Sequence, residues 1–272
     1  MSNQILRYPI PISDRITFLF AEYGSLECDG HAVVLRQGDI KTHFPVGSTT
    51  VIAIEPGTVV THAAVKACAE SGCLLIWIGE GGVRCYAAGI ANSSPEHLLK
   101  QAQLHLESTK RLNVARRIYR LMFDEDPPSG RSIEQLRGIE GAKVKILYRD
   151  IAEKKGIRWN GRDQKAIKFD PLNSAISSAN AALYGLVEAA IVALGYSPSI
   201  GFIHSGDVRS FVYDISDTLK FTTVVPAAME AFCQDNNVTE SKMRKLCRDI
   251  FRQQNMVAHI IARIDYVLDE RL

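Results

Sequence analysis

The sequence has few cysteines, and their spacing suits neither a disulfide framework nor a metal site. The 272 residues contain six, at positions 28, 68, 73, 85, 233 and 247, and no two follow a C-x-x-C spacing. This distribution excludes a disulfide-rich scaffold and disfavours structural zinc. We therefore expect reduced cysteines within hydrophobic cores.

Long hydrophobic runs and a secretion signal are also missing. The most apolar stretch, residues 181–194, contains Tyr184, Gly185 and Glu188, so it predicts a buried helix and not a membrane span. The first 15 residues lack the basic start, apolar block and cleavage site of a signal peptide. With 46% hydrophobic and 23% charged residues, the composition is that of an ordinary globular chain, which we expect in the cytoplasm.

Positive charge is unevenly distributed along the chain. The net charge is only +2, but residues 131–168 contain 11 Lys or Arg and five Asp or Glu, a local charge of +6. Such a segment attracts polyanions, because neutralised phosphates release condensed counterions. A solvated helix face would explain the same charge without a ligand, so charge alone leaves both interpretations open.

Short apolar runs separated by turn residues occupy the chain from about residue 15 to residue 89. They are rich in β-branched residues and alternate with polar ones, which predicts the strands of a meander or a small sandwich. One helix interrupts them, since Thr61 can cap it and Gly72 can end it. We expect a small β-sandwich-like domain with one helix over residues 1–93.

The pattern then becomes helical almost to the end of the chain. This predicts a larger all-α domain over residues 94–272, and an α+β fold overall. Its first helix should begin after Ser94-Pro95 and run unbroken over residues 96–123. The apolar residues of this helix predict a buried stripe at Leu98, Ala102, Leu106, Leu112 and Ile118.

Four further helices are expected in the same domain. Ser132 and Gln135 form a capping-box pattern at the start of one that ends near Gly156. The others are predicted over residues 173–194, 224–232 and 240–268.

A carboxylate lies among the apolar residues of the capping-box helix. Glu140 is four residues from both Leu136 and Val144, which places it on their face. An ionised carboxylate facing a core is costly unless it is paired or bound to a metal. A salt bridge to Lys143 or Arg137 on the same helix is the structural alternative.

A histidine and two aspartates follow later in the chain. His204 comes after an apolar run and before Ser205-Gly206, at the edge of a loop, where an imidazole can bind a metal or simply pack. Asp214 and Asp217 are three residues apart on one helical face, although such a pair also occurs as a helix cap or dipole partner.

Together these residues suit one kind of metal. Glu140, His204 and one or two aspartates supply oxygen ligands and an imidazole, a set that fits Mg²⁺ or Mn²⁺ better than zinc. A hard cation neutralises phosphate oxygens and polarises a nucleophile, which is what phosphodiester chemistry needs. The basic segment would hold the substrate.

Six motifs spread almost from end to end of the chain carry a family resemblance: EPGTVVTHAAV, GEGGVRCYAAG, EQLRGIEGAKVK, NAALYGLVEAAI, GFIHSGDVRSFVYDISDTLKFTTVVP and CRDIFR. They resemble the CRISPR-associated integrases of spacer acquisition, most of all the branch that accompanies the Cascade interference complex. That branch pairs an N-terminal β domain with a helical catalytic domain. One departure is visible, because Val59 and Val60 follow EPGT here, where relatives tend to have an arginine.

The resemblance implies roles for individual residues. Glu140, His204 and Asp217 would bind the divalent metal, with Asp214 as an assisting neighbour. Asn180 and Tyr184 would line the helix that faces the metal. DNA contacts are implied for Tyr23, which would stack on a duplex end, and for the basic residues Arg84, Lys220, Arg244 and Arg248. Ordinary packing or ion pairing is the alternative for each.

The resemblance also implies partners and a reaction. The N-terminal domain would serve dimerisation and duplex contact, and two homodimers would flank a dimer of a small second adaptation subunit. This assembly would hold a duplex with 3′ overhangs. Each 3′-hydroxyl would attack a phosphodiester of the CRISPR repeat DNA and displace another 3′-oxygen, and the same site could cut branched DNA.

Two other functions remain open at this point. One is a metal-dependent nuclease that cleaves branched DNA in repair. The other is a non-catalytic DNA-binding scaffold whose acidic residues only cap helices. Composition does not separate them from the integrase.

Overall fold

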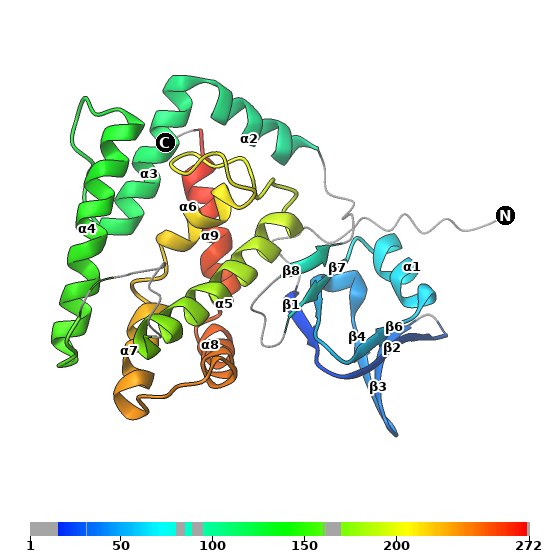
Figure 1. The fold of residues 1–272 in the computed structure, drawn as a ribbon. Coiled ribbons are helices and arrows are strands. Elements are labelled where there is room, and N and C mark those ends of the chain that lie inside the picture. The colour runs from blue at the N-terminus through cyan, green and yellow to red at the C-terminus, as the bar shows by residue number, and fades with distance from the viewer. Residues whose placement is uncertain are drawn as a thin grey trace. The chain divides into compact units, whose positions relative to one another are not determined.

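The chain forms two compact units. The computed structural model describes residues 16–30, 32–79, 85–88, 95–159, 161 and 170–270. The N-terminal unit comprises Met1–Gly79 and Cys85–Ser94, and the helical unit comprises Glu80–Arg84 and Pro95–Leu272 (Figure 1). A strand-rich unit followed by a helical one confirms the predicted α+β fold class.

The described strands of the N-terminal unit form two four-stranded sheets. The first sheet has the order β1 (Ile16–Ala21), β5 (Thr49–Ile54), β7 (Leu74–Ile78) and β8 (Cys85–Ala88). The second has the order β4 (Ile40–Phe44), β3 (Ala32–Gln37), β2 (Gly24–Asp29) and β6 (Thr58–Val60). Because β5 pairs in parallel with β1 and β7, and β2 with β6, a simple meander is excluded.

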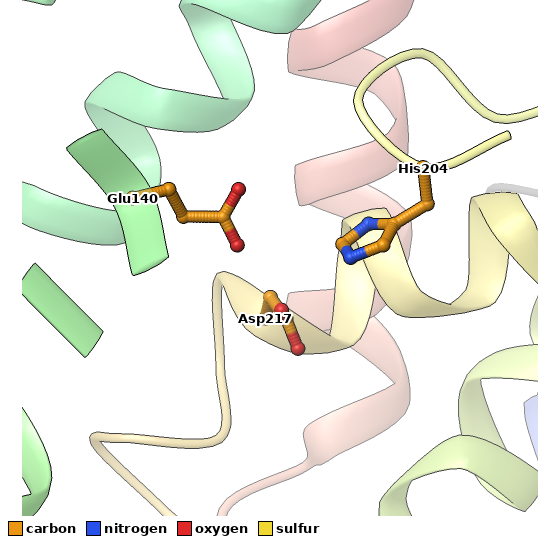
Figure 2. A group of neighbouring side chains, drawn as sticks. All are labelled: Glu140, His204 and Asp217. Atoms are coloured by element: carbon orange, nitrogen blue, oxygen red, sulfur yellow. The ribbon is translucent and has the colours of Figure 1, made fainter. Parts of the chain in front are cut away.

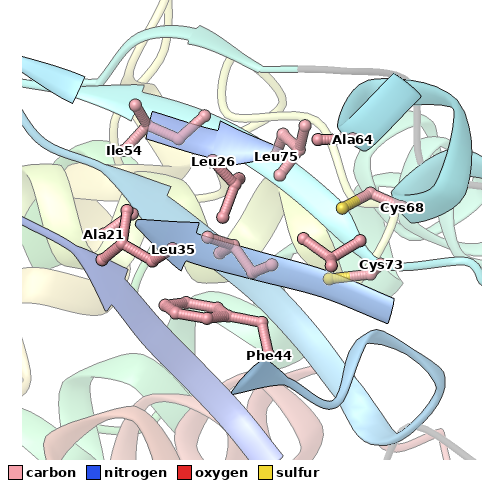
Figure 3. Close-up of a cluster of buried hydrophobic side chains, with 11 residues drawn as sticks. Ala21, Leu26, Leu35, Phe44, Ile54, Ala64, Cys68, Cys73 and Leu75 are labelled. Atoms are coloured by element: carbon pink, nitrogen blue, oxygen red, sulfur yellow. The ribbon is translucent and has the colours of Figure 1, made fainter. Parts of the chain in front are cut away.

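Both sheets contribute to one hydrophobic core, which fits the sandwich-like prediction. Ile54 and Leu75 from the first sheet meet Leu26 and Leu35 from the second, with α1 (His62–Glu70) covering the cluster (Figure 3). Each fully buried Leu or Ile contributes roughly 1.5–3 kcal/mol relative to leaving it exposed.

Helix α1 has the predicted ends. The side chain of Thr61 accepts a hydrogen bond from the backbone N–H of Ala64 at 3.3 Å, and Gly72 follows the helix at φ +68°. Cys68 and Cys73 lie in this core and Cys247 is buried in the helical unit, as expected, but Cys233 is exposed.

The helical unit contains the following α-helices, in chain order: α2 (Glu96–Leu106), α3 (Ser108–Phe123), α4 (Ile133–Lys154), α5 (Pro171–Ala193), α6 (Ser210–Asp217), α7 (Val224–Gln234), α8 (Glu240–Gln253) and α9 (Met256–Leu268). Helix α5 lies at its centre and contacts α6, α7, α8 and α9. It is long and apolar enough to cross a membrane, yet 72% of its most apolar window is buried inside the protein. It is the buried helix that the sequence predicted, and its ends lie within two residues of the predicted range 173–194.

Two predicted helices are each broken into two. The helix expected over residues 96–123 is interrupted at Glu107, whose backbone is extended at φ −82° and ψ 109°. The helix expected from residue 240 is interrupted at Asn255, which adopts φ 46° and ψ 49°. The stripe expected on α2 is also wrong in part, because Leu98 is 42% exposed and Leu106 81% exposed.

Candidate metal centre

Glu140 is held on the inner face of α4. The helix begins with the predicted capping box between Ser132 and Gln135. Glu140 is only 9% exposed. The predicted salt-bridge alternative is wrong for Lys143, which pairs with Glu125 instead, and among the described residues no ion pair joins Glu140 to Arg137. The Glu140 carboxylate is therefore buried without a same-helix counter-charge.

His204 lies in the segment between α5 and α6, and Asp214 orients it. The Asp214 side chain has no exposed surface and accepts hydrogen bonds from the backbone N–H groups of Phe202 at 2.5 Å, Ile203 at 3.2 Å and His204 at 2.9 Å. It also lies 2.8 Å from the Nδ1 of His204. An N–H at Nδ1 donates to this carboxylate, so the imidazole is left with Nε2 to accept or bind.

Asp214 lies outside the group of three residues whose ligand atoms approach one another. The sequence suggested it as a fourth metal-binding residue, but both of its oxygens are taken up by the His204 segment. Its burial and four contacts suit a residue that fixes the loop and the tautomer of the histidine. The i, i+3 spacing to Asp217 could not distinguish these two roles.

Asp217 ends α6 and pairs with a buried lysine. Its Oδ1 lies 2.6 Å from the Nζ of Lys220, and both side chains are about one-tenth exposed or less. Burial alone would lower the pKa of Lys220, but Asp217, with Tyr184 and Tyr148, raises it. Lys220 is thus a charged, largely buried side chain beside the site, and its DNA contact stays a prediction.

Glu140, His204 and Asp217 converge from three separate parts of the helical unit. One ligand atom from each lies within 4.8 Å of the other two. Figure 2 shows the Glu140 carboxylate extending from α4 towards the imidazole, with Asp217 beside them at the end of α6. Glu140 and His204 are 64 positions apart in the chain, and His204 and Asp217 are 13 apart, yet the fold brings all three together.

The electrostatics of this cluster are unfavourable without a cation. Burial, and then the negative charge of Asp217, raise the pKa of Glu140 from 4.5 to about 7, although His204 and Lys220 act against this. Burial lowers the pKa of His204, but the hydrogen bond and charge of Asp214 raise it overall. Two carboxylates so close together are a typical cause of a raised pKa, which a divalent cation would remove.

The donor set fits a hard divalent metal. Two carboxylates and one neutral imidazole are ligands that Mn²⁺ and Mg²⁺ accept, and the set contains no thiolate that would select zinc. Asp214 supplies the carboxylate that commonly orients a metal-binding histidine. Glu140, His204 and Asp217 are therefore the residues that would hold the metal.

The residues expected to contact DNA lie in varied environments. Tyr23, between β1 and β2, is 67% exposed, as a stacking residue must be. On α8, Arg244 lies 3.3 Å from Glu240 and Arg248 lies 3.8 Å from Asp249, so both basic side chains have acidic neighbours. Arg84 lies outside the described residues.

Two predicted residues of α5 line the interior of the helical unit. Tyr184 packs edge-on against Tyr213, with 5.2 Å between ring centroids. Asn180 is 4% exposed, and its Oδ1 has no hydrogen-bond partner among the described residues. These positions do not indicate that Tyr184 or Asn180 binds the metal.

Two further residues at the site were not found from the sequence. The Tyr213 ring lies 5.8 Å from the His204 ring and also 5.8 Å from the Arg209 guanidinium. At Gly201, a Cβ would lie 2.5 Å from the carbonyl oxygen of His204 and 2.7 Å from the Cβ of Ser210. The lack of a side chain at Gly201 thus lets its backbone lie close to His204 and Ser210. In the sequence, the signal for this approach was a glycine three residues before the histidine.

Comparison with known proteins gives consistent matches. The family model described as "CRISPR associated protein Cas1" matches residues 18–125 and 122–247. Two proteins named "CRISPR-associated endonuclease Cas1", from Geobacter sulfurreducens and Escherichia coli, are each 47% identical over 265 residues. Those alignments cover 96% of this chain and 87% of each relative.

Solved structures agree with the sequence matches. The structure titled "Crystal structure of TtCas1-DNA complex" has a TM-score of 0.85 and 34% identity, and covers 94% of this chain and 98% of its own. The structure titled "Casposase bound to integration product" has a TM-score of 0.61 at 14% identity, which indicates a shared fold only.

Proposed function

This chain belongs to the Cas1 family of CRISPR-associated proteins, and we propose that it is a metal-dependent DNA endonuclease and integrase that inserts short DNA fragments into a CRISPR repeat array. The observation that carries the proposal is the convergence of Glu140, His204 and Asp217 within 4.8 Å in the helical unit. A cluster that merely capped helices would not bring an α4 carboxylate to the histidine of a distant loop.

The residues of the site suit transesterification at phosphorus. A bound Mg²⁺ or Mn²⁺ would neutralise charge on the phosphate and polarise an attacking hydroxyl. Glu140, His204 and Asp217 would hold that ion, and Asp214 keeps the imidazole turned so that Nε2 is available. A 3′-hydroxyl then forms a new phosphodiester bond while the bond to another 3′-oxygen breaks, so no energy-rich cofactor is consumed.

DNA and protein partners are part of the proposal. The relative titled as a DNA complex supports DNA as the substrate class. We propose that Tyr23 and the basic residues Arg84, Arg244 and Arg248 contact the ends of a duplex with 3′ overhangs. CRISPR repeat DNA would be the target. A homodimer, two copies of which flank a dimer of a small second adaptation subunit, would act in the cytoplasm with the N-terminal unit serving dimerisation.

A strand-transfer assay tests this function. Purified protein, with the second subunit, is incubated with Mn²⁺ or Mg²⁺, a short duplex bearing 3′-hydroxyls, and a supercoiled plasmid carrying the repeat array. We expect the duplex strand to become joined to the plasmid at the repeat. The joining must disappear when the duplex carries 3′-deoxy ends, because the nucleophile is then absent.

Two substitutions test whether Glu140 and His204 belong to the catalytic site. His204→Ala and Glu140→Gln should abolish joining while salt-sensitive DNA binding remains. Plasmid nicking without any joined product would favour the repair nuclease. Binding without either reaction, in wild type and variants alike, would favour the non-catalytic scaffold.

A further inference from the structure

The segment that carries His204 has no helix or strand of its own. It joins α5 to α6, and Gly201, Phe202 and Ile203 within it are buried. Buried backbone N–H and C=O groups need hydrogen-bond partners. Backbone contacts such as that between the Gly201 N–H and the Ser199 carbonyl satisfy some of them, and side chains from elsewhere satisfy several others.

Asp214 accepts from the N–H groups of Phe202, Ile203 and His204, and side chains of α2 and α3 donate to carbonyl groups of the segment. The amide nitrogen of Gln101 donates to the carbonyls of Ser197 at 3.0 Å and Ile200 at 2.9 Å, and its Oε1 accepts from the N–H of Ser197 at 2.7 Å. Gln101 has no exposed surface. One side chain thus makes three backbone hydrogen bonds with this segment.

Two more side chains continue the same pattern nearer to the histidine. The Nδ1 of His105 lies 2.6 Å from the carbonyl oxygen of Gly201, so it must carry the proton and donate. The Nε of Arg111 donates to the carbonyl of Phe202 at 3.1 Å. These contacts end two residues before His204.

The orientation of α2 follows from these bonds. His97, Gln101 and His105 are spaced by four residues and lie on one face, and His97 Nδ1 reaches the carbonyl of Leu194 at 2.6 Å. Leu98 and Leu106 are exposed instead. The inward face of α2 therefore combines these polar side chains with the buried Leu104, so hydrogen bonds as well as apolar burial hold the helix in place.

We propose that Gln101, His105 and Arg111 are positioning residues for the metal centre, which hold the carbonyl side of the His204 segment while Asp214 holds its N–H side. The inference rests on the proposed metal site, because it concerns how one ligand of that site is placed. Without the His105 donor, the buried Gly201 carbonyl has lost its partner three residues before the imidazole. Gly201 leaves the backbone no room to move towards α6.

The first experiment observes the metal-free protein. In ¹⁵N-labelled full-length protein, the ring-nitrogen signals of His204 are assigned by their loss in His204→Asn. We expect His105→Ala to shift these signals, because the Nδ1 hydrogen bond to Asp214 lengthens. His105→Asn should restore most of the wild-type shift, since its amide N–H can occupy the place of Nδ1.

The second experiment measures Mn²⁺ binding by the metal alone. Loss of an outer contact of this kind typically weakens metal affinity by roughly 10–100-fold. We expect about tenfold or more for His105→Ala and for Gln101→Ala, with partial recovery in His105→Asn. If Gln101→Ala fails to fold by circular dichroism, the His105 pair still decides the question.

Gln103→Ala is the matched control. Gln103 is on the same helix but exposed, and it bonds only to Glu107 among the contacts that the described residues make. Unchanged His204 signals and an Mn²⁺ affinity within about twofold of wild type in His105→Ala would overturn the proposal, as would an equal loss in Gln103→Ala. If wild-type protein bound no Mn²⁺, the proposed function would fail, while the metal-free spectra would still decide the positioning role.

Discussion

Replacing Glu140 by Gln should stabilise the metal-free protein at alkaline pH. The folded pKa of Glu140, about 7, lies above its ordinary value of 4.5, so its protonated form stabilises the fold at low pH and this contribution is lost as pH rises through 7. At about 1.4 kcal/mol for each pH unit between the two values, the ionised carboxylate costs at most about 3.5 kcal/mol. Gln keeps the shape of the protonated acid and does not ionise.

The assay must report on the helical unit alone. The protein has two tryptophans, Trp77 in β7 and Trp159, which stacks on Tyr148 at 5.4 Å. In a Trp77→Phe background, fluorescence therefore follows the helical unit during urea unfolding. With EDTA present, we expect Glu140→Gln to be more stable than its parent by about 1–3 kcal/mol at pH 8, and equal within about 0.5 kcal/mol at pH 4.5.

Adding metal should reverse the order of stability. Mn²⁺ at 100 times its Kd stabilises the parent by about 2.7 kcal/mol, whereas the variant lacks a charged ligand and should gain much less. Asn173→Ala, elsewhere in the helical unit, serves as a control whose effect should not depend on metal. The reasoning is refuted if Glu140→Gln is no more stable than its parent at pH 8 in EDTA, or if its advantage is the same at pH 4.5.

The remaining predictions concern the same centre. Mn²⁺ affinity should weaken by up to about tenfold per pH unit below 7, because binding must displace the proton of Glu140, and calorimetry in buffers of different ionisation enthalpy should detect its release. Asp214→Asn should lower Mn²⁺ affinity by roughly 10–100-fold, and unchanged affinity would contradict its orienting role. Gly201→Ala should destabilise the helical unit by roughly 1–3 kcal/mol, measured by urea unfolding, since its Cβ meets the His204 carbonyl. Lys220→Met should destabilise the metal-free protein by roughly 3 kcal/mol at pH 8, with recovery on adding Mn²⁺; a loss that metal does not relieve would argue for a packing role.

The sequence predicted the fold class because its local signals were strong. Thr61 caps the start of α1 and Gly72 follows its end, while the Ser132–Gln135 capping box starts α4, as expected from short-range hydrogen bonding. Glu140 also stood out, since a carboxylate on an apolar face is unusual in any helix. Its partners followed from family resemblance and not from spacing, because residues 64 apart have no local relation.

Long-range effects account for the errors. Neither Glu107 nor Asn255 is a proline or glycine, so the pattern predicted no break, although Asn255 tolerates the left-handed conformation that it adopts. On α2, the leucine spacing was interpreted as the buried face, although Gln101 and His105 occupy that face. Their hydrogen bonds join residues more than 90 apart in sequence, which no periodicity can reveal.

The order of the ligands along the chain has a consequence during synthesis. Asp217 is the last of the three to be synthesised, 13 residues after His204. A nascent chain, or a fragment that stops before α6, therefore carries an incomplete ligand set. The proposed metal site is therefore complete only after residue 217 has been synthesised.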